Sequence, residues 1–251
     1  MAATGGSLTA HPPSPRSPVL RLRLLGGFGL DIDHATVDLP HGAQRILAFL
    51  ALRPHSLQRT FLAGSLWLDA SDDRAAANLR SAVWRIRHLG HPILLIGHGT
   101  LRLDQAVIVD VRAAQDTAHR WLAGQPKARD MAGGSALLRA DLLPDWYDEW
   151  VVDERDRFRQ LRLHALEGMA EHLIAMGRYG EALLAALEAA REDPLRESAQ
   201  RALINVHLAE GNTGEAVRQL RRCEQLFDRE LGLRPSRRLT DLVRDAVLSG
   251  T

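Results

Sequence analysis

Two stretches of this chain repeat each other at a fixed spacing, and that spacing limits the folds that the chain can adopt. Residues 172–183 read HLIAMGRYGEAL and residues 206–217 read VHLAEGNTGEAV, so the pattern G-x-x-G-E-A begins at Gly177 and again at Gly211, 34 positions later. A period of about 34 residues, with glycine at a turn and alanine where two helices pack closely, is typical of tetratricopeptide repeats. We therefore predict paired helices over the second half of the chain.

The first half of the chain predicts a different order of elements. Residues 19–33 alternate apolar and polar side chains around the glycine turn GGFG, which indicates two strands, and this GGFG lacks the third glycine of a nucleotide-binding loop. Three stretches with helical apolar periodicity follow, at 42–53, 59–69 and 71–90. A hairpin with a glycine-containing tip is predicted at 93–104. Sheet, three helices and hairpin are the order of a winged helix-turn-helix.

Together these patterns predict a multi-domain protein that is α+β first and then all-α. We expect a disordered tail at 1–18, because this segment is small, polar and proline-rich, without the apolar stretch of a secretory signal. A winged-helix DNA-binding domain is expected at 19–110, and tetratricopeptide-like helices at 111–251. A single cysteine, Cys223, excludes an internal disulfide, and no apolar run is long enough for a membrane span, so a cytoplasmic protein is expected.

The third predicted helix of the first half has two distinct faces when its residues are placed about 100° apart. Its apolar residues fall within one arc of about 120°, wide enough to face a core. The apolar residues are Ala75, Leu79, Ala82, Val83 and Ile86. The residues opposite them are Arg74, Asn78, Ser81, Arg85 and His88, and Arg80, Trp84 and Arg87 follow one edge.

The polar face of this helix contains no acid after Asp73. Solvated helices usually mix acids with bases, which then pair at i, i+4. Arginine, asparagine, serine and histidine instead match phosphates and base edges. A solvated face remains an alternative, because only Lys127 among the 32 basic residues is lysine and the chain is arginine-rich throughout. Its place in a winged helix favours DNA.

The predicted contacts divide into two groups. Residues that face the groove are expected to reach base edges, and residues on the edges of the helix and in the hairpin are expected to hold phosphates. The first group is Arg74, Asn78, Ser81 and Arg85; the second is Arg80, Arg87 and Arg102, with His88 as a further contact.

The net charge of +1 does not by itself indicate a nucleic-acid partner. Residues 1–110 hold 11 arginines and 8 acids, a charge of +3, whereas the remaining residues hold 21 basic residues and 23 acids, a charge of −2. This small contrast fits a basic DNA reader joined to a neutral interaction domain.

These motifs resemble the Streptomyces antibiotic regulatory protein family of transcriptional activators. The similarity in the first half lies in LRLLGGFGLDID, in the Leu66-Trp67 pair, and in NLRSAVWRIRHLG followed by LRLD. The second half is similar to the bacterial transcriptional activation domain in LLPDWYDEWVVDERDRFRQLRLHALEGMAEHL, GRYGEAL, DPLRESAQRALI and ELGLRPSRRL. The resemblance extends from about residue 20 to residue 246.

The resemblance implies a response-regulator-type winged helix followed by a tetratricopeptide-like domain. It also implies an activator that binds direct repeats in double-stranded promoter DNA and contacts RNA polymerase holoenzyme, associated with the nucleoid. The helical repeats are expected to form a homodimer, to meet the polymerase, or to hold a regulatory partner. No G-x-x-x-x-G-K-[ST] motif occurs, so we expect a stand-alone member without an NTPase domain.

No enzyme, cofactor or metal site is predicted. His164 and His172 are eight residues apart on one helix and about 80° out of line, which does not suit a shared metal. The aromatic cluster at 146–150 is expected to pack between the domains rather than to form a cage. Two alternatives stay open: an interaction scaffold whose winged helix does not bind DNA, and an enzyme that uses the histidine-bearing helix.

Overall fold

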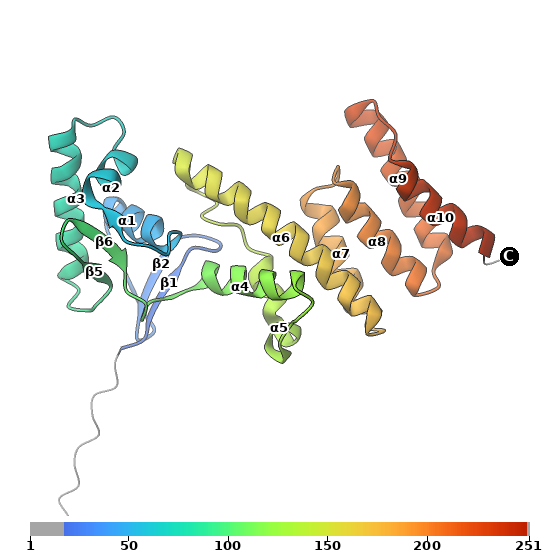
Figure 1. Ribbon diagram of the computed structural model, residues 1–251, viewed down its shortest axis with the longest axis horizontal. Helices are drawn as coiled ribbons and strands as arrows, with labels where there is room; N and C mark the ends of the chain where they lie inside the picture. The colour runs from blue at the N-terminus through green and yellow to red at the C-terminus, as the bar shows by residue number, and fades with distance from the viewer. Residues whose placement is uncertain (1–17, 250–251) are drawn as a thin grey trace, which may run out of the picture.

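The structure is a computed structural model that describes residues 18–249, except for the side chains of 132–135. Apart from Pro18, the tail predicted at 1–18 lies outside the described residues. Figure 1 shows an elongated molecule with two β-sheets and helices α1–α3 at one end and the paired helices α6–α10 at the other. This order confirms the predicted fold class of α+β followed by all-α.

The described residues begin with a small mixed sheet, whose first strand alternates buried and exposed side chains. β1 pairs with β2 so that Leu22 lies opposite Leu30, and Gly26 and Gly27 make the turn between them with φ of +76° and +136°. Because positive φ is costly for residues with a Cβ, these glycines have a structural reason that requires no nucleotide. The sheet has the order β3-β2-β1-β7, with β7 parallel to β1. Its strands are β1 (Leu20–Arg23), β2 (Gly29–Ile32), β3 (Ala35–Val37) and β7 (Ile108–Val109).

Three helices and a second sheet complete the first part as a winged helix. β5 and β6 form the predicted hairpin, and β4 pairs with the other edge of β6, giving the order β4-β6-β5. α1 packs against both α2 and α3, and its apolar residues are fully buried. These elements are α1 (His41–Ala51), β4 (Leu57–Gln58), α2 (Arg59–Leu66), α3 (Asp72–Arg87), β5 (Leu94–Ile96) and β6 (Thr100–Leu103).

The apolar pattern of residues 59–69 predicts that Phe61, Leu62, Leu66 and Trp67 face inward, and α2 departs from this prediction at Phe61. Phe61 is 52% exposed and Trp67 is half-buried. The helix ends at Leu66, so Trp67 sits beyond its last turn, and Leu62 and Leu66 fill the buried stripe of this short helix. The prediction of an inward Phe61 was therefore wrong, because two turns of helix provide room for only one narrow stripe.

The second part consists of helices throughout. α6 is the longest helix and packs against α4, α7 and α8. The helix bounds are α4 (Asp110–Leu122), α5 (Ala128–Gly133), the 3-10 turn η1 (Gly134–Leu138), α6 (Glu149–Ala175), α7 (Tyr179–Glu192), α8 (Glu197–Ala209), α9 (Thr213–Leu231) and α10 (Arg237–Ser249).

The sequence repeat corresponds to two helix pairs. Gly177 lies between α6 and α7 with φ of +71°, and Gly211 lies between α8 and α9 with φ of +83°. Ala182 and Ala216, at equivalent positions in the first turn of α7 and α9, are both fully buried. The predicted turn glycines and close-packing alanines are thus both confirmed.

The two parts share one continuous hydrophobic core. The Asp110 carboxylate at the start of α4 accepts backbone N–H groups of Leu24 at 2.9 Å and Leu25 at 3.0 Å. The Trp150 ring at the start of α6 lies 5.0 Å from Phe49 of α1, edge to face. Backbone, aromatic and apolar contacts thus all cross between the two parts.

The two tryptophans of the aromatic cluster at 146–150 are half-buried and pack against the core at this junction, as predicted. Trp146 stacks on Phe28 at 5.9 Å and meets His41 at 5.0 Å. Tyr147, however, is 86% exposed, so its predicted role in packing was wrong. It precedes α6 and points away because the two tryptophans occupy the inward positions.

A buried ion pair fastens α4 to α5. Arg120 donates to both oxygens of Asp130 at 2.6 Å, and the backbone N–H of Lys127 donates to the same carboxylate at 2.8 Å. The hydrogen bond from the Arg120 guanidinium is the main cause that lowers the pKa of Asp130 from 3.8 to about 2. The carboxylate is thus stabilised in its charged form.

We expect Asp130→Asn to lower the free energy of unfolding by about 2 kcal/mol at neutral pH, since one pKa unit corresponds to about 1.4 kcal/mol. A depressed carboxyl pKa adds stability above the unfolded pKa, and this stability is lost as pH falls through the folded pKa. The difference between the two proteins should therefore shrink between about pH 4 and pH 2. Urea unfolding across this range measures it; a difference that does not change with pH would contradict the assignment.

We expect Gly177→Ala to lower the free energy of unfolding by about 1 kcal/mol, because its φ of +71° strains any residue with a Cβ. Gly180→Ala is the matched control, since Gly180 lies in α7 with open space at its Cβ position. It should leave stability unchanged or raise it slightly. Equal losses in both variants, measured by thermal and urea unfolding, would contradict the role assigned to the turn.

Candidate nucleic-acid interface

The third helix of the winged helix, α3, has the orientation that its periodicity predicts. All five residues of the apolar stripe are buried, with Leu79 at 2% and Val83 at 5% exposure. The sequence predicts an N-cap at Ser71 or Asp72 and an end before Gly90; Ser71 holds the N-cap position without a capping hydrogen bond, and the helix ends at Arg87. The polar face consequently points away from the core.

The structure separates the predicted contact residues by exposure. Arg74, Arg80, Ser81, Arg85, Arg87 and His88 are exposed, whereas Asn78 and Arg102 are half-buried. Among the described residues, Asn78 has no hydrogen-bond partner for its side-chain amide. Its donor and acceptor are therefore free for a ligand in front of α3.

The arginines of α3 have no ion-pair partner in residues 18–249. This is true of Arg74, Arg80, Arg85 and Arg87, although Asp72 and Asp73 begin the same helix. In the helical part, most arginines pair with carboxylates. Examples are Arg120, Arg159, Arg162, Arg178, Arg191, Arg196 and Arg218. Positive charge is thus left uncompensated on α3, which is the arrangement that attracts phosphates.

A groove of about 480 Å³ lies between the second half of α3 and the hairpin. Arg80, Arg87 and His88 from the predicted set line it, together with Ile96 of β5 and two residues that sequence reasoning missed. These two are Arg59 and Trp84. The groove therefore combines three arginines with an aromatic ring, the mixture that suits a sugar–phosphate strand.

Arg59 is the first residue of α2, and its backbone N–H donates to the carbonyl of Gly99 in the hairpin tip at 2.9 Å. Its side chain has no partner in the part of the chain that the structure describes. The signal that could have identified it is its position, since the helix before the groove-facing helix crosses the DNA backbone in helix-turn-helix docking.

Trp84 is 56% exposed, which is unusual for a large aromatic side chain in a small domain. The His88 ring lies 3.7 Å from it, and His88 Nδ1 is 3.2 Å from the Trp84 carbonyl oxygen. The histidine therefore holds the indole in place on the rim of the groove. The periodicity of the sequence places Trp84 on one edge of α3, between the apolar and polar faces. This edge becomes a wall of the groove because the hairpin lies beside it.

Arg102 is not brought together with the α3 arginines. It lies opposite Leu95 in the β5–β6 pairing, between the buried Leu101 and Leu103. Because side chains alternate along a strand, Arg102 occupies the face of the hairpin opposite to those leucines, and opposite to Ile96 in the groove. It extends the basic surface on the other side of the hairpin.

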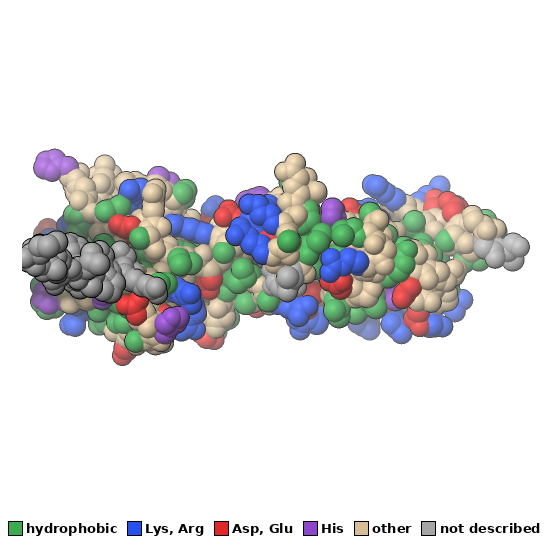
Figure 2. Space-filling view, turned by 90° about the horizontal axis from the view of Figure 1, so that it is seen from below, with side chains coloured by type: hydrophobic (Ala, Val, Ile, Leu, Met, Phe, Trp, Pro, Cys, Tyr) green, Lys and Arg blue, Asp and Glu red, His purple; other side chains and the backbone are tan. Residues whose placement is uncertain are grey.

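Basic side chains are distributed along the whole molecule. In Figure 2, blue Lys and Arg groups alternate with red Asp and Glu groups on the face seen from below, without one dominant basic field. This agrees with the net charge of +1. A local arrangement of arginines, rather than overall charge, would have to account for binding to nucleic acid.

The residues considered for other chemistry lie apart. His164 contacts Arg196 at 3.1 Å at the surface, whereas His172 packs edge-on against Trp121 at 5.6 Å. In the described part of the chain, no three His, Cys, Asp or Glu side chains lie close enough to share a metal ion.

Burial raises the pKa of the Cys223 thiol to about 11, which disfavours the reactive thiolate. Among the described residues, no helix has the length and apolar character to cross a bilayer.

We expect Arg80→Ala and Arg87→Ala each to change the free energy of unfolding by less than about 0.5 kcal/mol, because both side chains are exposed and neither pairs with any residue that the structure describes. The contrasting variant is Arg162→Ala. Arg162 is 2% exposed and bonds to Asp141 at 2.9 Å and to Glu192. Its loss should cost about 3 kcal/mol. Urea unfolding measures all three; a large loss in Arg80→Ala would mean that this arginine supports the fold.

The chain is similar to a known protein family and to a solved structure. The family model described as "bacterial transcriptional activator domain" matches residues 103–247, more than half of the chain. A search of curated proteins finds no match. Among solved structures, Mycobacterium tuberculosis EmbR in complex with a low-affinity phosphopeptide is similar, with a TM-score of 0.74 and 22% sequence identity.

The similarity to EmbR covers 93% of this chain and 66% of that one, so this chain spans just under two thirds of the length of EmbR. At this level of identity the match shows that the fold is shared. The family match and the shared fold together confirm the predicted resemblance to Streptomyces antibiotic regulatory proteins. The chain belongs to the bacterial transcriptional activator domain family.

Proposed function

We propose that the chain is a DNA-binding transcriptional activator whose α3 is the recognition helix. The observation that carries this proposal is the outward face of α3, where the arginines have no ion-pair partner in the described part of the chain and no carboxylate follows Asp73. Leaving several like charges side by side costs free energy, so such a face is favourable only where anions approach it. A winged helix presents this helix to the major groove of DNA.

The proposed contacts follow from position on α3. Arg74 and Asn78 lie in the first half of the helix, the half that reaches base edges in helix-turn-helix docking. The free amide of Asn78 has the donor and acceptor that match the major-groove edge of adenine. Ser81 and Arg85 continue this line toward the end of the helix.

The proposed phosphate contacts lie on both sides of the proposed base contacts of α3. Arg59, Arg80 and Arg87 line the groove between α3 and the hairpin, where one DNA strand would pass from the major to the minor groove. His88 is a further contact there, and Arg102 would reach the strand beyond the hairpin. Trp84 adds an apolar surface for a sugar ring.

We further propose that residues 19–110 act as the DNA-binding domain and 111–251 as the activation domain. The continuous core at their junction would hold the helical part in a fixed orientation over the bound promoter. The helical repeats are then the surface that meets RNA polymerase or a second copy of the chain. In this proposal the protein acts in the cytoplasm at the nucleoid, on direct repeats in promoters.

The test compares three variants on a fragment selected from genomic DNA by its affinity for the protein. Arg80→Ala should weaken binding to all DNA alike and lower the slope of log K against log salt by about one, because one phosphate contact is lost. Asn78→Ala should cost about 1–3 kcal/mol on the selected fragment only. Arg221→Ala, on the exposed face of α9, is the control and should change neither quantity.

Gel shifts at low and physiological salt provide the measurements. If Asn78→Ala leaves sequence preference unchanged, the assignment of α3 to the major groove is wrong. Absence of binding to any genomic fragment at low salt would favour the alternative of an interaction scaffold, for which the low net charge is the supporting observation.

A further inference from the structure

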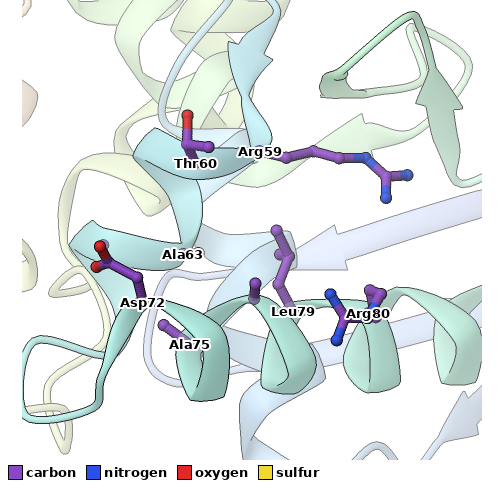
Figure 3. Close-up of a pocket in the computed structure, with 9 residues that line it drawn as sticks. Arg59, Thr60, Ala63, Asp72, Ala75, Leu79 and Arg80 are labelled. Carbon is purple, nitrogen blue, oxygen red and sulfur yellow. The ribbon is translucent and has the colours of Figure 1, made fainter.

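A second cavity, of about 330 Å³, lies between α2 and α3 and is distinct from the groove beside the hairpin. Figure 3 shows Ala63 of α2 across the cavity from Ala75 and Leu79 of α3. The volume falls at the lower end of the range for small-molecule sites, about 300–1,000 Å³. It is large enough for a ligand of one or two rings.

The cavity exists because the two helices present small side chains to each other. Gly64 on α2 and Ala76 on α3 line it along with the alanines in Figure 3. A Cβ added at Gly64 would meet no atom within 4 Å. Gly64, Thr60 and Asp72 are exposed, so the cavity is open to solvent, whereas the buried Ala63, Ala75 and Leu79 form its apolar floor.

The two ends of the cavity carry opposite charge. Arg59 and Arg80 lie at one end, and Asp72 and Thr60 at the other (Figure 3). Asp72 and Arg80 are eight residues apart on α3, a rise of about 12 Å. In the described residues, neither arginine side chain nor the Asp72 carboxylate has a hydrogen-bond or ion-pair partner. Polar groups that converge on an apolar cavity are the usual marks of a ligand site.

We propose that this cavity binds an elongated small molecule with an anionic group at one end, an apolar body, and an ammonium or hydroxyl donor at the other. The anion pairs with Arg59 and Arg80, the body lies on Ala63, Ala75 and Leu79, and the donor reaches Asp72. A molecule about 10 Å long spans these groups.

The regulatory consequence rests on the proposed function. Arg59 and Arg80 are also proposed phosphate contacts, so a bound anion and DNA compete for the same two guanidinium groups. Losing two phosphate contacts near 0.1 M salt lowers the affinity for DNA by about tenfold or more. The ligand therefore releases the protein from its promoter.

The probe for the test is a rigid para,para-disubstituted biphenyl with a carboxylate at one end and an aminomethyl group at the other. Two analogues serve as controls, one that lacks the carboxylate and one that lacks the amine. Titration calorimetry on the full chain without DNA should give sub-millimolar binding of the probe and at least tenfold weaker binding of both analogues. Equal binding of all three, or no binding of the probe at several millimolar, overturns the proposal.

Gly64→Leu places a side chain inside the cavity and removes no charged group. It should abolish probe binding and leave the affinity for DNA within about twofold, with circular dichroism to verify folding. The control is Gly180→Leu, since Gly180 also lies on a helix with open space at its Cβ position, far from α2. It should bind the probe as the unmodified chain does. Ala76→Leu fills the cavity from α3 and is the second variant if Gly64→Leu does not fold.

Competition completes the test. Saturating probe should raise the apparent Kd for the selected genomic fragment at least tenfold in the unmodified chain and not in Gly64→Leu. Unchanged DNA affinity in the presence of bound probe overturns the regulatory role. If the chain binds the probe but no genomic fragment, the proposed function is contradicted and the ligand site is supported. If the chain binds DNA but not the probe, the ligand site is contradicted and the proposed function is supported.

Discussion

The burial of one apolar stripe of α3 against α1 and α2 is the contact on which the rest of the molecule depends. Leu79, Val83 and Ile86 fix the rotation of the helix about its axis, and this rotation alone decides which side chains remain outside. With the apolar residues at 6% exposure or less, the helix cannot turn without exposing several of them to water, at about 25 cal/mol for each square ångström. The arginine face is thus held outward by the core beneath it.

The same core continues beyond the winged helix. Phe49 of α1 contacts Trp150 of α6, and the Asp110 carboxylate links the segment that follows β1 to the start of α4. Arg45 pairs with Asp148 across the same junction at 2.5 Å. Because these contacts link α1, which supports α3, with the longest helix of the second part, the orientation of the helical repeats is tied to that of the proposed recognition helix. A partner that meets the repeats would therefore stand at a defined place relative to the DNA.

The two parts of the molecule differ more clearly in how their arginines pair with carboxylates than in their net charge. In the helical part, arginine and carboxylate side chains join neighbouring helices, as Arg162 does with Asp141 of the connecting segment and Glu192 of α7. On α3 the arginines have no such partners among residues 18–249. An ion pair inside a fold fixes geometry, whereas an unpaired guanidinium on a surface keeps its charge available for a ligand. A total of +1 conceals this difference.

Local periodicity in the sequence determined most of the architecture. The buried and exposed faces of α3, the glycine turns at Gly177 and Gly211, and the hairpin after α3 follow from repeats of two, 3.6 and 34 residues, because each of these is set by neighbours along the chain. Only the tertiary structure decided that Arg59 and Trp84 share a groove with Arg87 and that a cavity remains between α2 and α3. It also decided that Arg102 faces away from this groove and that Phe61 and Tyr147 are exposed. These outcomes depend on which surfaces meet when distant segments pack, and a pattern along one helix carries no information about the side chains of the element that covers it.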